Sequence, residues 1–440
     1  MTRRIVITGM GAVTPLGHNV EDVWQELLKC ASGIGPTTLF DASTFPTSFS
    51  GQVDDFDYLA QVPEQLRDNH KNAGRNSRFI IDAAMQAWNQ ASLPFPVPPE
   101  NNNSNLPTSD MIGVYLGAGE GPLDFESVIA ATINGWQVEE QAMDWLKWTQ
   151  TALGQMNAKQ ELEQEPNLPG AHLAQLFRLR GPCMSCLTAC AASTQAIGEA
   201  AELIRCGEAD IVLTGGTHSM IHPFGVTGFN RLTALSTRND TPQEASRPFD
   251  RERDGFVLSE GAGALIIEEL QWAQRRGATI LAEIIGYGST ADAFRVTDQH
   301  EDGRGGIAAV RQALADANLS INDIDYISAH GTGTSENDSI ESHIIRTVFA
   351  ERAYQIPISS VKSMLGHLIA AAGAVELITC VLAIRDQIIP PTTNLTQPDN
   401  DCDLDYVPNQ PRKIPVNIAM SNSFGFGGQN NTLIIRKFTE

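Results

Sequence analysis

Cysteine, positive charge and long apolar runs are all scarce in this sequence. Its 440 residues hold seven cysteines, and an odd number with Cys30, Cys206, Cys380 and Cys402 far apart argues against a disulfide framework. We therefore expect a reducing, cytoplasmic location. No apolar run is long enough to span a bilayer, and "MTRRIVITGMGAVTPLG" is too broken by glycine for a signal peptide, so we expect no membrane association. A net charge of −22 excludes the basic footprint of a nucleic-acid binder.

Short β-branched runs alternate with helical patterns along the chain. The runs are "RIVITGM", "MIGVYLGA", "ADIVLTGGT", "GALIIEEL", "ILAEIIGYG", "IDYISAHG", "VNIAMSNSFG" and "TLIIRK". Continuous apolar strands between helices predict an α/β fold with mostly parallel sheets covered by helices. A strand, a small-residue turn and an Ala-rich helix occur around Cys190 and again around His367, which indicates a duplicated α/β unit.

Two stretches depart from this alternation. Residues 137–166 are the least regular part of the chain and predict one or two amphipathic helices. A polar loop is predicted around residues 101–103.

Three cysteines cluster in "GPCMSCLTACAAS", at Cys183, Cys186 and Cys190. The first two have CxxC spacing, but neither a second pair nor a histidine pair follows at zinc-site spacing. We expect Cys183 and Cys186 to lie along a buried strand as structural thiols. The glycine-rich segments lack the complete fingerprint of a phosphate cradle, so we predict neither a metal nor a nucleotide cofactor.

Cys190 differs because it ends a strand signal and precedes the helical pattern "AASTQAIGEAAELI". A thiol at a helix N-terminus faces the positive end of the helix dipole, which lowers the thiol pKa from about 8.5. A nucleophile and a packed side chain both remain open from this segment alone.

Two histidines strengthen the interpretation of Cys190 as a nucleophile. His330 ends the strand signal "IDYISAHGTGT", and His367 follows Gly366 at the start of another Ala-rich helix. Ligands bind at such strand ends in α/β sheets, so the thiol and two imidazoles form a candidate constellation.

The segments "LTACAAST", "AHGTGT", "VKSMLGHLIAAAG" and "SNSFGFGGQN", in this order, resemble the β-ketoacyl-[acyl-carrier-protein] synthases, the elongating type II condensing enzymes. The resemblance implies the thiolase fold, a duplicated five-layered αβαβα body that forms a homodimer. Residues 1–270 would form the half with the nucleophile, with an insertion at about 137–166. Residues 271–440 would form the half with both histidines and the lysine. No cofactor is implied.

The implied reaction is a decarboxylating Claisen condensation in fatty-acid, or specialised lipid or polyketide, chain elongation. Cys190 matches the nucleophile that accepts an acyl group from acyl carrier protein, the implied partner. His330 and His367 match the pair that promotes decarboxylation of malonyl-[acyl-carrier-protein]. Phe424 and Cys190 match the residues whose backbone N–H groups form the oxyanion hole, and Phe424 with Gly425–Gly428 resembles a gate.

Other positions match supporting roles. Lys362 matches a buried lysine and Glu341 its acidic partner, and we expect this pair to fix the geometry and charge of the histidines. Thr332 and Thr334 match hydroxyls that bind phosphopantetheine. Carrier protein is acidic, so we predict a local basic docking patch. Its candidate residues are Arg67, Lys71, Arg75 and Arg78.

Three alternatives follow from the same resemblance. A chain-length-determining partner subunit of a ketosynthase heterodimer normally lacks the nucleophile, whereas Cys190 is present. A thiolase acting on coenzyme A esters needs a second cysteine near the C-terminus, and "SNSFGFGGQN" contains none. A pathway-specific polyketide ketosynthase stays open, because residues 137–166 exceed the family's usual connection.

Overall fold

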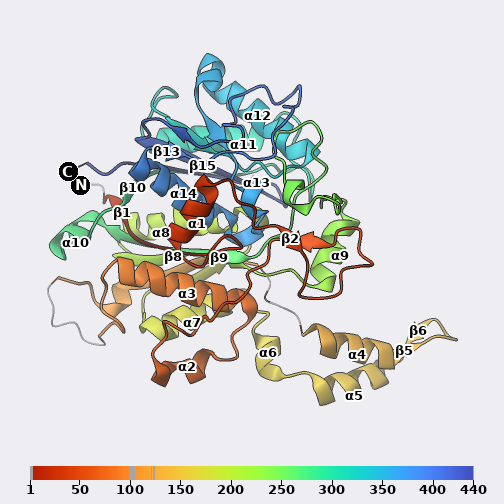
Figure 1. Cartoon of the computed structure of the whole chain (residues 1–440). Coiled ribbons are helices and arrows are strands. Elements are labelled where there is room, and N and C mark those ends of the chain that lie inside the picture. The colour runs from red at the N-terminus through yellow and green to blue at the C-terminus, as the bar shows by residue number, and fades with distance from the viewer. Residues whose placement is uncertain (1–2, 99–104, 120, 122–123, 440) are drawn as a thin grey trace.

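The computed structural model describes residues 3–98, 105–119, 121 and 124–439 (Figure 1). The loop predicted around residues 101–103 lies outside these ranges. A single ten-stranded sheet runs through the described part of the chain, in the order β12-β11-β15-β16-β10-β1-β9-β8-β4-β7. Among the described residues, no helix is long and apolar enough to cross a membrane.

Eight of the ten sheet strands coincide with the β-branched runs of the sequence, which confirms those predictions, and β7 and β12 lie outside the runs. In chain order the sheet strands are β1 (Ile5–Val13), β4 (Ile112–Ala118), β7 (Cys183–Cys186), β8 (Ile211–His218), β9 (Gly261–Glu269), β10 (Ala282–Ala291), β11 (Tyr326–Ser328), β12 (Ile358–Ser359), β15 (Ile418–Gly425) and β16 (Gln429–Arg436). Most are buried along their whole length because helices cover both faces.

The strand order repeats one pattern twice. In the first half β4 runs parallel to β7 and β8, and β9 runs antiparallel to β8 and β1. In the second half β11 runs parallel to β12 and β15, and β16 runs antiparallel to β15 and β10. An antiparallel contact between β1 and β10 joins the halves. The predicted duplication is therefore confirmed, but the prediction of mostly parallel sheets is wrong. Apolar runs report burial on two faces and carry no information on strand direction.

Helices form three layers around and between the two halves of the sheet. The outer helices of the first half, α3 (Arg75–Gln90) and α7 (Leu168–Phe177), contact its strands. The outer helices of the second half are α11 (Arg304–Asp316) and α12 (Ser335–Phe349). Between the halves lie α8 (Ala192–Cys206) and α14 (Ala372–Asp386), which contact each other and both sides (Figure 1). The five-layered αβαβα arrangement is thus confirmed.

Shorter elements complete the two halves. The remaining elements outside residues 125–162 are α1 (Val20–Leu28), β2 (Gly35–Pro36), β3 (Phe49–Ser50), α2 (Glu64–His70), η1 (Ser109–Met111), η2 (Ala189–Ala191), α9 (Pro223–Arg231), η3 (Pro242–Glu244), α10 (Leu270–Arg275), η4 (Ala350–Gln355), α13 (Lys362–Leu365), η5 (Ile369–Ala371), β13 (Ile388–Ile389) and β14 (Arg412–Lys413). The domain boundary at 270/271 falls within α10, after its first residue, and stays a prediction.

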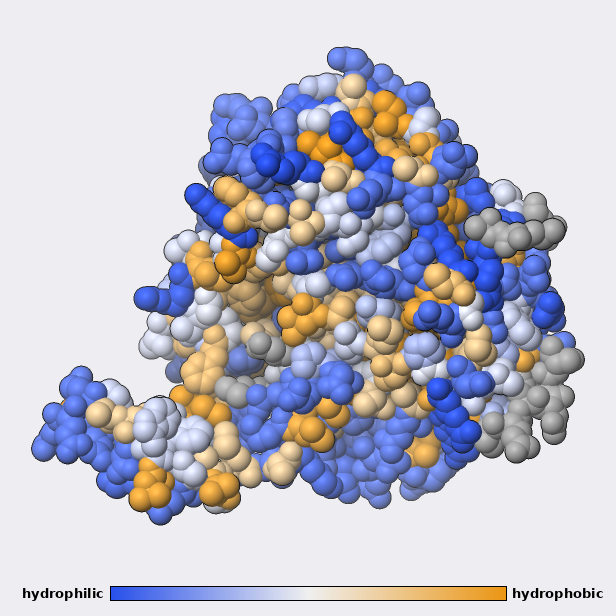
Figure 2. All heavy atoms as spheres, turned by 180° about the vertical axis from the view of Figure 1, so that it is seen from behind, coloured by the Kyte–Doolittle hydropathy of each residue, from blue (hydrophilic) through white to orange (hydrophobic). Residues whose placement is uncertain are grey.

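An arm projects from the first half between β4 and α7, where the sequence predicts one or two amphipathic helices (Figure 1). It consists of α4 (Phe125–Gly135), β5 (Trp136–Gln137), β6 (Ala142–Met143), α5 (Trp145–Gln155) and α6 (Ala158–Leu162). Apolar side chains gather on its surface (Figure 2), and those that are strongly exposed are Ile133, Trp136, Val138, Trp145, Leu146, Leu153 and Leu162. We call residues 125–162 the arm.

A buried carboxylate fastens the base of the arm to the body. Glu163 accepts hydrogen bonds from the Gly74 N–H (2.8 Å) and the Ser77 hydroxyl (3.2 Å). Its other oxygen lies 2.9 Å from Nε2 of His172, whose Nδ1 lies 2.9 Å from Nδ1 of His70. Helix α7 and the segment before α3 are thereby tied to the end of α6.

Strand β7 corrects one prediction about the cysteine cluster. It is an edge strand of the sheet, and Cys183 is exposed while Cys186 is half-buried. Cys183 is therefore not a core thiol. An apolar run at a sheet edge has the same sequence pattern as one in the middle, so the residues gave no sign of the difference.

Gly117 offers a test of how α8 is positioned. A Cβ atom at Gly117 would lie 2.3 Å from the Ala192 carbonyl carbon and the Ser193 nitrogen, so the backbones of β4 and α8 are in direct contact there. We expect Gly117→Ala to lower the free energy of unfolding by roughly 1–3 kcal/mol, the usual cost of overpacking, measured by urea denaturation. Gly154→Ala in α5, where a Cβ meets nothing within 4 Å, is the control and should show no loss. Equal stability of Gly117→Ala and wild type would contradict this packing.

Candidate active site

Cys190 lies in the single turn η2, directly before helix α8, and its side chain is buried. The preceding Ala189 has φ 48°, a left-handed conformation that costs an ordinary residue roughly 1–2 kcal/mol. The same geometry recurs in the second half, where Ile369 has φ 47° at the start of η5, before α14. Two equivalent strained turns thus meet where α8 and α14 begin. Cys190 lies at a helix start, as the sequence predicts.

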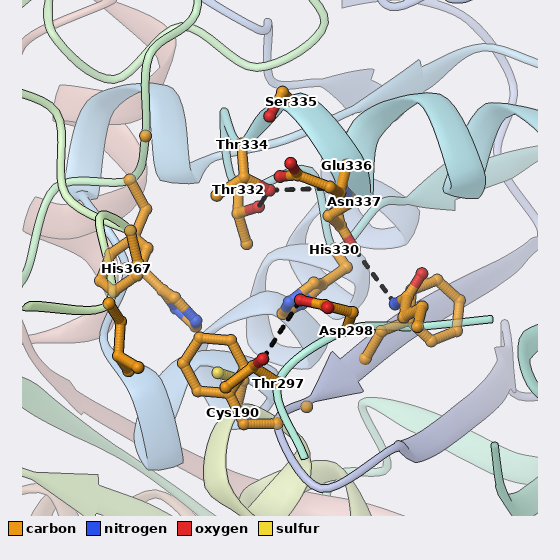
Figure 3. A pocket seen from close by; sticks show the side chains of 18 of the residues that line it. Cys190, Thr297, Asp298, His330, Thr332, Thr334, Ser335, Glu336, Asn337 and His367 are labelled. Carbon is orange, nitrogen blue, oxygen red and sulfur yellow. Dashed lines mark hydrogen bonds between the residues drawn. The ribbon is translucent and has the colours of Figure 1, made fainter. Parts of the chain in front are cut away.

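The two predicted histidines join Cys190 from the second half. His330 follows β11, and His367 follows Gly366, whose φ of 72° lets the chain turn after α13. The Cys190 sulfur and one nitrogen of each ring all lie within 4.8 Å of one another. The ring centroids of the histidines are 5.4 Å apart, nearly perpendicular, and Figure 3 shows both rings directed toward the sulfur.

Hydrogen bonds behind each ring set where its proton sits. Nδ1 of His367 accepts the Ile369 N–H at 3.2 Å, so a neutral ring carries its proton on Nε2. Nδ1 of His330 faces the Lys362 ammonium at 3.5 Å, which gives the same tautomer. Both rings therefore present an N–H donor, and Nε2 of His367 has no partner among the described residues.

Burial keeps both rings neutral. It lowers the pKa of His330 and of His367 well below 6.5, and the positive charge of Lys362 lowers both further. The edges of Phe424 and Phe256 contact His330 and His367, with ring centroids 6.0 and 5.3 Å apart. The site thus holds two fixed, uncharged donors beside a thiol.

The pKa of Cys190 departs from the sequence-based prediction. Burial raises the pKa of the thiol to about 11, whereas a helix N-terminus alone lowers it. The Lys362 charge and the backbone N–H groups of Phe426 and Cys190 oppose this rise without cancelling it. Desolvation outweighs the helix terminus because the sulfur is almost completely removed from water. The resting group at neutral pH is a thiol.

The same contacts bear on the oxyanion hole, which stays a prediction. The N–H directed at the Cys190 sulfur comes from Phe426, not from Phe424. Phe424 is the last but one residue of β15, paired opposite Asn430 of β16, whereas Phe426 lies in the turn after the strand. Sequence reasoning missed Phe426 because "SFGFGG" offers two phenylalanines two residues apart. Only the strand end shows which one has a backbone N–H free of the ladder.

Lys362 also has a different partner from the one predicted. Its ammonium pairs with the buried carboxylate of Glu376 on α14. Glu341 instead accepts the backbone N–H groups of His330 and Gly331, both at 2.8 Å, and burial raises its pKa to about 7. Glu341 therefore holds the His330 loop. Glu376 takes the place predicted for Glu341, as the acidic partner of Lys362. Glu376 was missed because it lies within an apolar Ala-rich helix.

The three groups open into a cavity of about 370 Å³ that also contains both predicted threonines. The hydroxyls of Thr332 and Thr334 lie 3.0 Å apart (Figure 3), and Asp338 accepts the Thr332 N–H at 3.1 Å. A cavity of this size can hold a slender polar ligand that reaches Cys190 from the threonines.

The predicted basic patch is largely engaged within the protein. Nε of Arg75 donates to Glu260 at 2.8 Å, and Nε of Arg67 and of Arg78 donate to backbone carbonyls. Lys71 pairs with Asp68 at the surface. The patch stays a prediction, with Arg75 the residue least able to reach a partner.

The Cys190–His330–His367 set also has the spacing of three metal ligands. Two features oppose this use. The Lys362 ammonium stands beside His330 and would repel a cation, and the ring nitrogens that face the sulfur carry protons. The arrangement suits a nucleophile with two hydrogen-bond donors aimed at a developing negative charge.

Family models place this geometry in a known class. Residues 2–273 match the β-ketoacyl synthase N-terminal domain, and residues 281–396 match the C-terminal domain. The chain belongs to the β-ketoacyl synthase family.

Individual relatives show which members of the family the chain is similar to. The chain is 40% identical over 444 residues to the 3-oxoacyl-[acyl-carrier-protein] synthase 2 of Coxiella burnetii, covering 99% of both proteins. It is 41% identical over 436 residues to the enzyme of the same name from Synechocystis sp., covering 99% of this chain and 98% of that one.

Solved structures share the fold over the full length. A type II polyketide ketosynthase in complex with its acyl carrier protein, bound to a hexaketide, is 32% identical with a TM-score of 0.84, and coverage is 100% of both chains. A β-ketoacyl synthase from Burkholderia phymatum is 31% identical with a TM-score of 0.84, covering 99% of this chain and 100% of that one. These neighbours agree with the thiolase fold.

The raised thiol pKa predicts how Cys190 reacts with iodoacetamide. Since the thiolate is the reactive form and the pKa is about 11, the rate at Cys190 should rise about tenfold per pH unit between about pH 7 and 10. Peptide mass spectrometry separates Cys190 from the exposed Cys183 and Cys206. Lys362→Met removes the charge that lowers the pKa and should slow the reaction at each pH. A plateau reached below pH 8 would contradict the raised pKa.

Proposed function

We propose that the protein joins an acyl group held on Cys190 to malonyl-[acyl-carrier-protein], releasing carbon dioxide and 3-ketoacyl-[acyl-carrier-protein] in fatty-acid chain elongation. The observation that carries the proposal is the convergence of the Cys190 sulfur with a nitrogen of His330 and of His367 in one cavity. Membership of the β-ketoacyl synthase family supports it.

Acyl transfer is the first step. The Cys190 sulfur attacks the thioester of an acyl carrier, the carrier's sulfur leaves, and the thiol proton passes to it, so that one thioester replaces another. The tetrahedral oxyanion lies where the N–H groups of Phe426 and Cys190 converge. A thiol with a high pKa is also a poor leaving group until it is stabilised, which favours retention of the acyl group between steps.

Decarboxylation is the second step and uses the histidines. The bond between the malonyl carboxylate and its neighbouring carbon breaks, carbon dioxide leaves, and the electron pair moves into the thioester carbonyl as an enolate. The Nε2–H groups of His330 and His367 donate to that oxygen. Because the rings are held neutral and oriented beforehand, their donation strengthens as the charge develops.

Condensation closes the cycle. The nucleophilic carbon of the enolate attacks the acyl carbonyl on Cys190, whose oxygen again meets the Phe426 N–H. Collapse of this intermediate expels the Cys190 sulfur, which takes up a proton, and the lengthened chain remains on the carrier. The Thr332 and Thr334 hydroxyls lie where they can bind the carrier's pantetheine amides.

We propose acyl carrier protein as the partner and the cytoplasm as the location of the protein. The solved structure of a type II polyketide ketosynthase in complex with its acyl carrier protein, which is 32% identical to this chain, supports this partner. The seven free cysteines agree with a reducing compartment.

A homodimer forms part of the proposal. Edge strand β7 leaves one side of its backbone unpaired and carries the exposed Met184, with Leu187 directly after it. The same strand of a second copy can continue the sheet, and the apolar surface of the arm can pack on that copy.

One observation favours a specialised variant of the same reaction. The arm contains most of the predicted insertion at residues 137–166, and a type II polyketide ketosynthase is among the full-length structural neighbours. Relatives at 40–41% identity are fatty-acid-type synthases, so the polyketide pathway is the second candidate. Presence of Cys190 disfavours a partner subunit that only sets chain length.

Loss of the nucleophile should abolish acyl-enzyme formation. We expect Cys190→Ala, incubated with acyl-[acyl-carrier-protein], to show no added acyl mass by intact mass spectrometry. Cys206→Ser changes an exposed cysteine at the far end of α8 and should acylate like wild type. An acyl adduct on Cys190→Ala would overturn the proposal.

Loss of one donor should slow decarboxylation. We expect His367→Ala to release carbon dioxide from malonyl-[acyl-carrier-protein] roughly 10²–10³ times more slowly, the usual effect of removing one oxyanion donor. The exposed His343 provides the matched control, and His343→Ala should leave the rate unchanged. Undiminished release by His367→Ala would refute the role of this ring.

A further inference from the structure

A third buried histidine has no function in the reaction described above. His218 ends β8, is 4% exposed, and neither ring nitrogen has a hydrogen-bond partner among the residues that the structure describes. By contrast, the buried pair His70 and His172 is bonded to Glu163. An imidazole without partners is costly to bury, so its retention points to a ligand that supplies them.

His218 stands beside the catalytic groups. Its strand contacts η5, the turn that follows His367, and a positive charge on its ring would lower the pKa of His367. Three residues further on, Ile221 packs in the apolar cluster that surrounds Cys190. That cluster also contains Val226, Leu235, Phe256, Leu258 and Ile369.

The backbone of a neighbouring strand end lies close to the ring because a side chain is missing there. A Cβ at Gly119, directly after β4, would lie 2.5 Å from Nδ1 of His218. Glycine there leaves this nitrogen uncovered by a side chain from the neighbouring strand end.

The charge state fixes what His218 can bind. Burial lowers its pKa to about 3, so the ring is neutral and offers one N–H donor and one nitrogen acceptor. The neighbouring His222 does not satisfy it, because Nδ1 of His222 accepts the Gly225 N–H at 3.2 Å and no hydrogen bond joins the two rings in the described part of the chain. A hydroxyl can bond either ring nitrogen, accepting from the N–H or donating to the other nitrogen, and a carbonyl can accept from the N–H. A saturated hydrocarbon chain can use neither.

We propose that His218 is a specificity-determining residue that hydrogen-bonds an oxygen atom on the acyl chain attached to Cys190. The inference rests on the proposed function, since it places the acyl chain in the apolar cluster around Cys190. It predicts a preference for acyl groups that carry a hydroxyl or carbonyl within the chain over saturated groups of the same length.

The test compares acyl groups of one length. Octanoyl and hydroxyoctanoyl pantetheine thioesters, with the hydroxyl at each odd carbon in turn, are offered to wild type, and acylation of Cys190 is timed by intact mass spectrometry. We expect at least one hydroxylated isomer to react roughly tenfold faster than octanoyl, since only it satisfies the buried ring. Equal rates for all isomers would overturn the inference.

Variants separate recognition from folding. His218→Leu should lose the preference by accelerating octanoyl relative to its hydroxylated isomers, and His218→Gln, which keeps a donor and an acceptor, should retain part of it. The ratio of the two rates is independent of the active fraction of each preparation. His343→Leu, at an exposed histidine, should leave the ratio unchanged. An unchanged ratio in His218→Leu would mean that the ring binds only a buried water.

A binding measurement keeps this inference distinct from the proposed reaction. Calorimetric titration of wild type and His218→Leu with octanoic acid and hydroxyoctanoic acids requires no acyl transfer. A hydroxy-acid preference that disappears in His218→Leu supports the assignment even if no acyl-enzyme forms, an outcome that would refute the proposed function alone. No preference in either assay refutes the role of His218.

Discussion

The charge of one buried ammonium governs the active site. Lys362 pairs with Glu376 and faces Nδ1 of His330, so its position fixes a proton on the far nitrogen of that ring. Together with burial, which is the larger effect, the same charge keeps His330 and His367 neutral, and it offsets part of the burial that raises the pKa of Cys190. A buried ion pair contributes little net stability, so electrostatic control of its neighbours accounts better for its presence.

Duplication of one structural unit explains how these groups meet. Each half places a strained residue, a single 3-10 turn and a fifteen-residue helix at the same point of its sheet. The first half uses that turn to hold Cys190, and the second half uses His367, two residues before its turn, as a donor. Since α8 and α14 begin at the contact between the halves, the sulfur and the ring lie side by side without any loop spanning the distance.

Much of this arrangement can be predicted from the sequence, because long apolar strands and Ala-rich helices have clear patterns, and Cys190, His330 and His367 each follow a strand signal or glycine turn. Four features could not be predicted. The choice between Phe424 and Phe426 depends on where β15 ends, and the pairing of Lys362 with Glu376 depends on how α14 lies against α13. The edge position of Cys183 and the burial of Cys190 depend on what covers each residue, which no local pattern encodes.

The arm leaves the body after β4 and returns through Glu163 without adding a strand to the central sheet. We therefore expect changes between residues 126 and 162 to leave the spacing of the sulfur and imidazoles unaltered. Evolution can therefore change the outer surface of this enzyme, and with it the proteins that bind there, while the chemistry stays constant. The arm is the part of the chain in which descendants can diverge first.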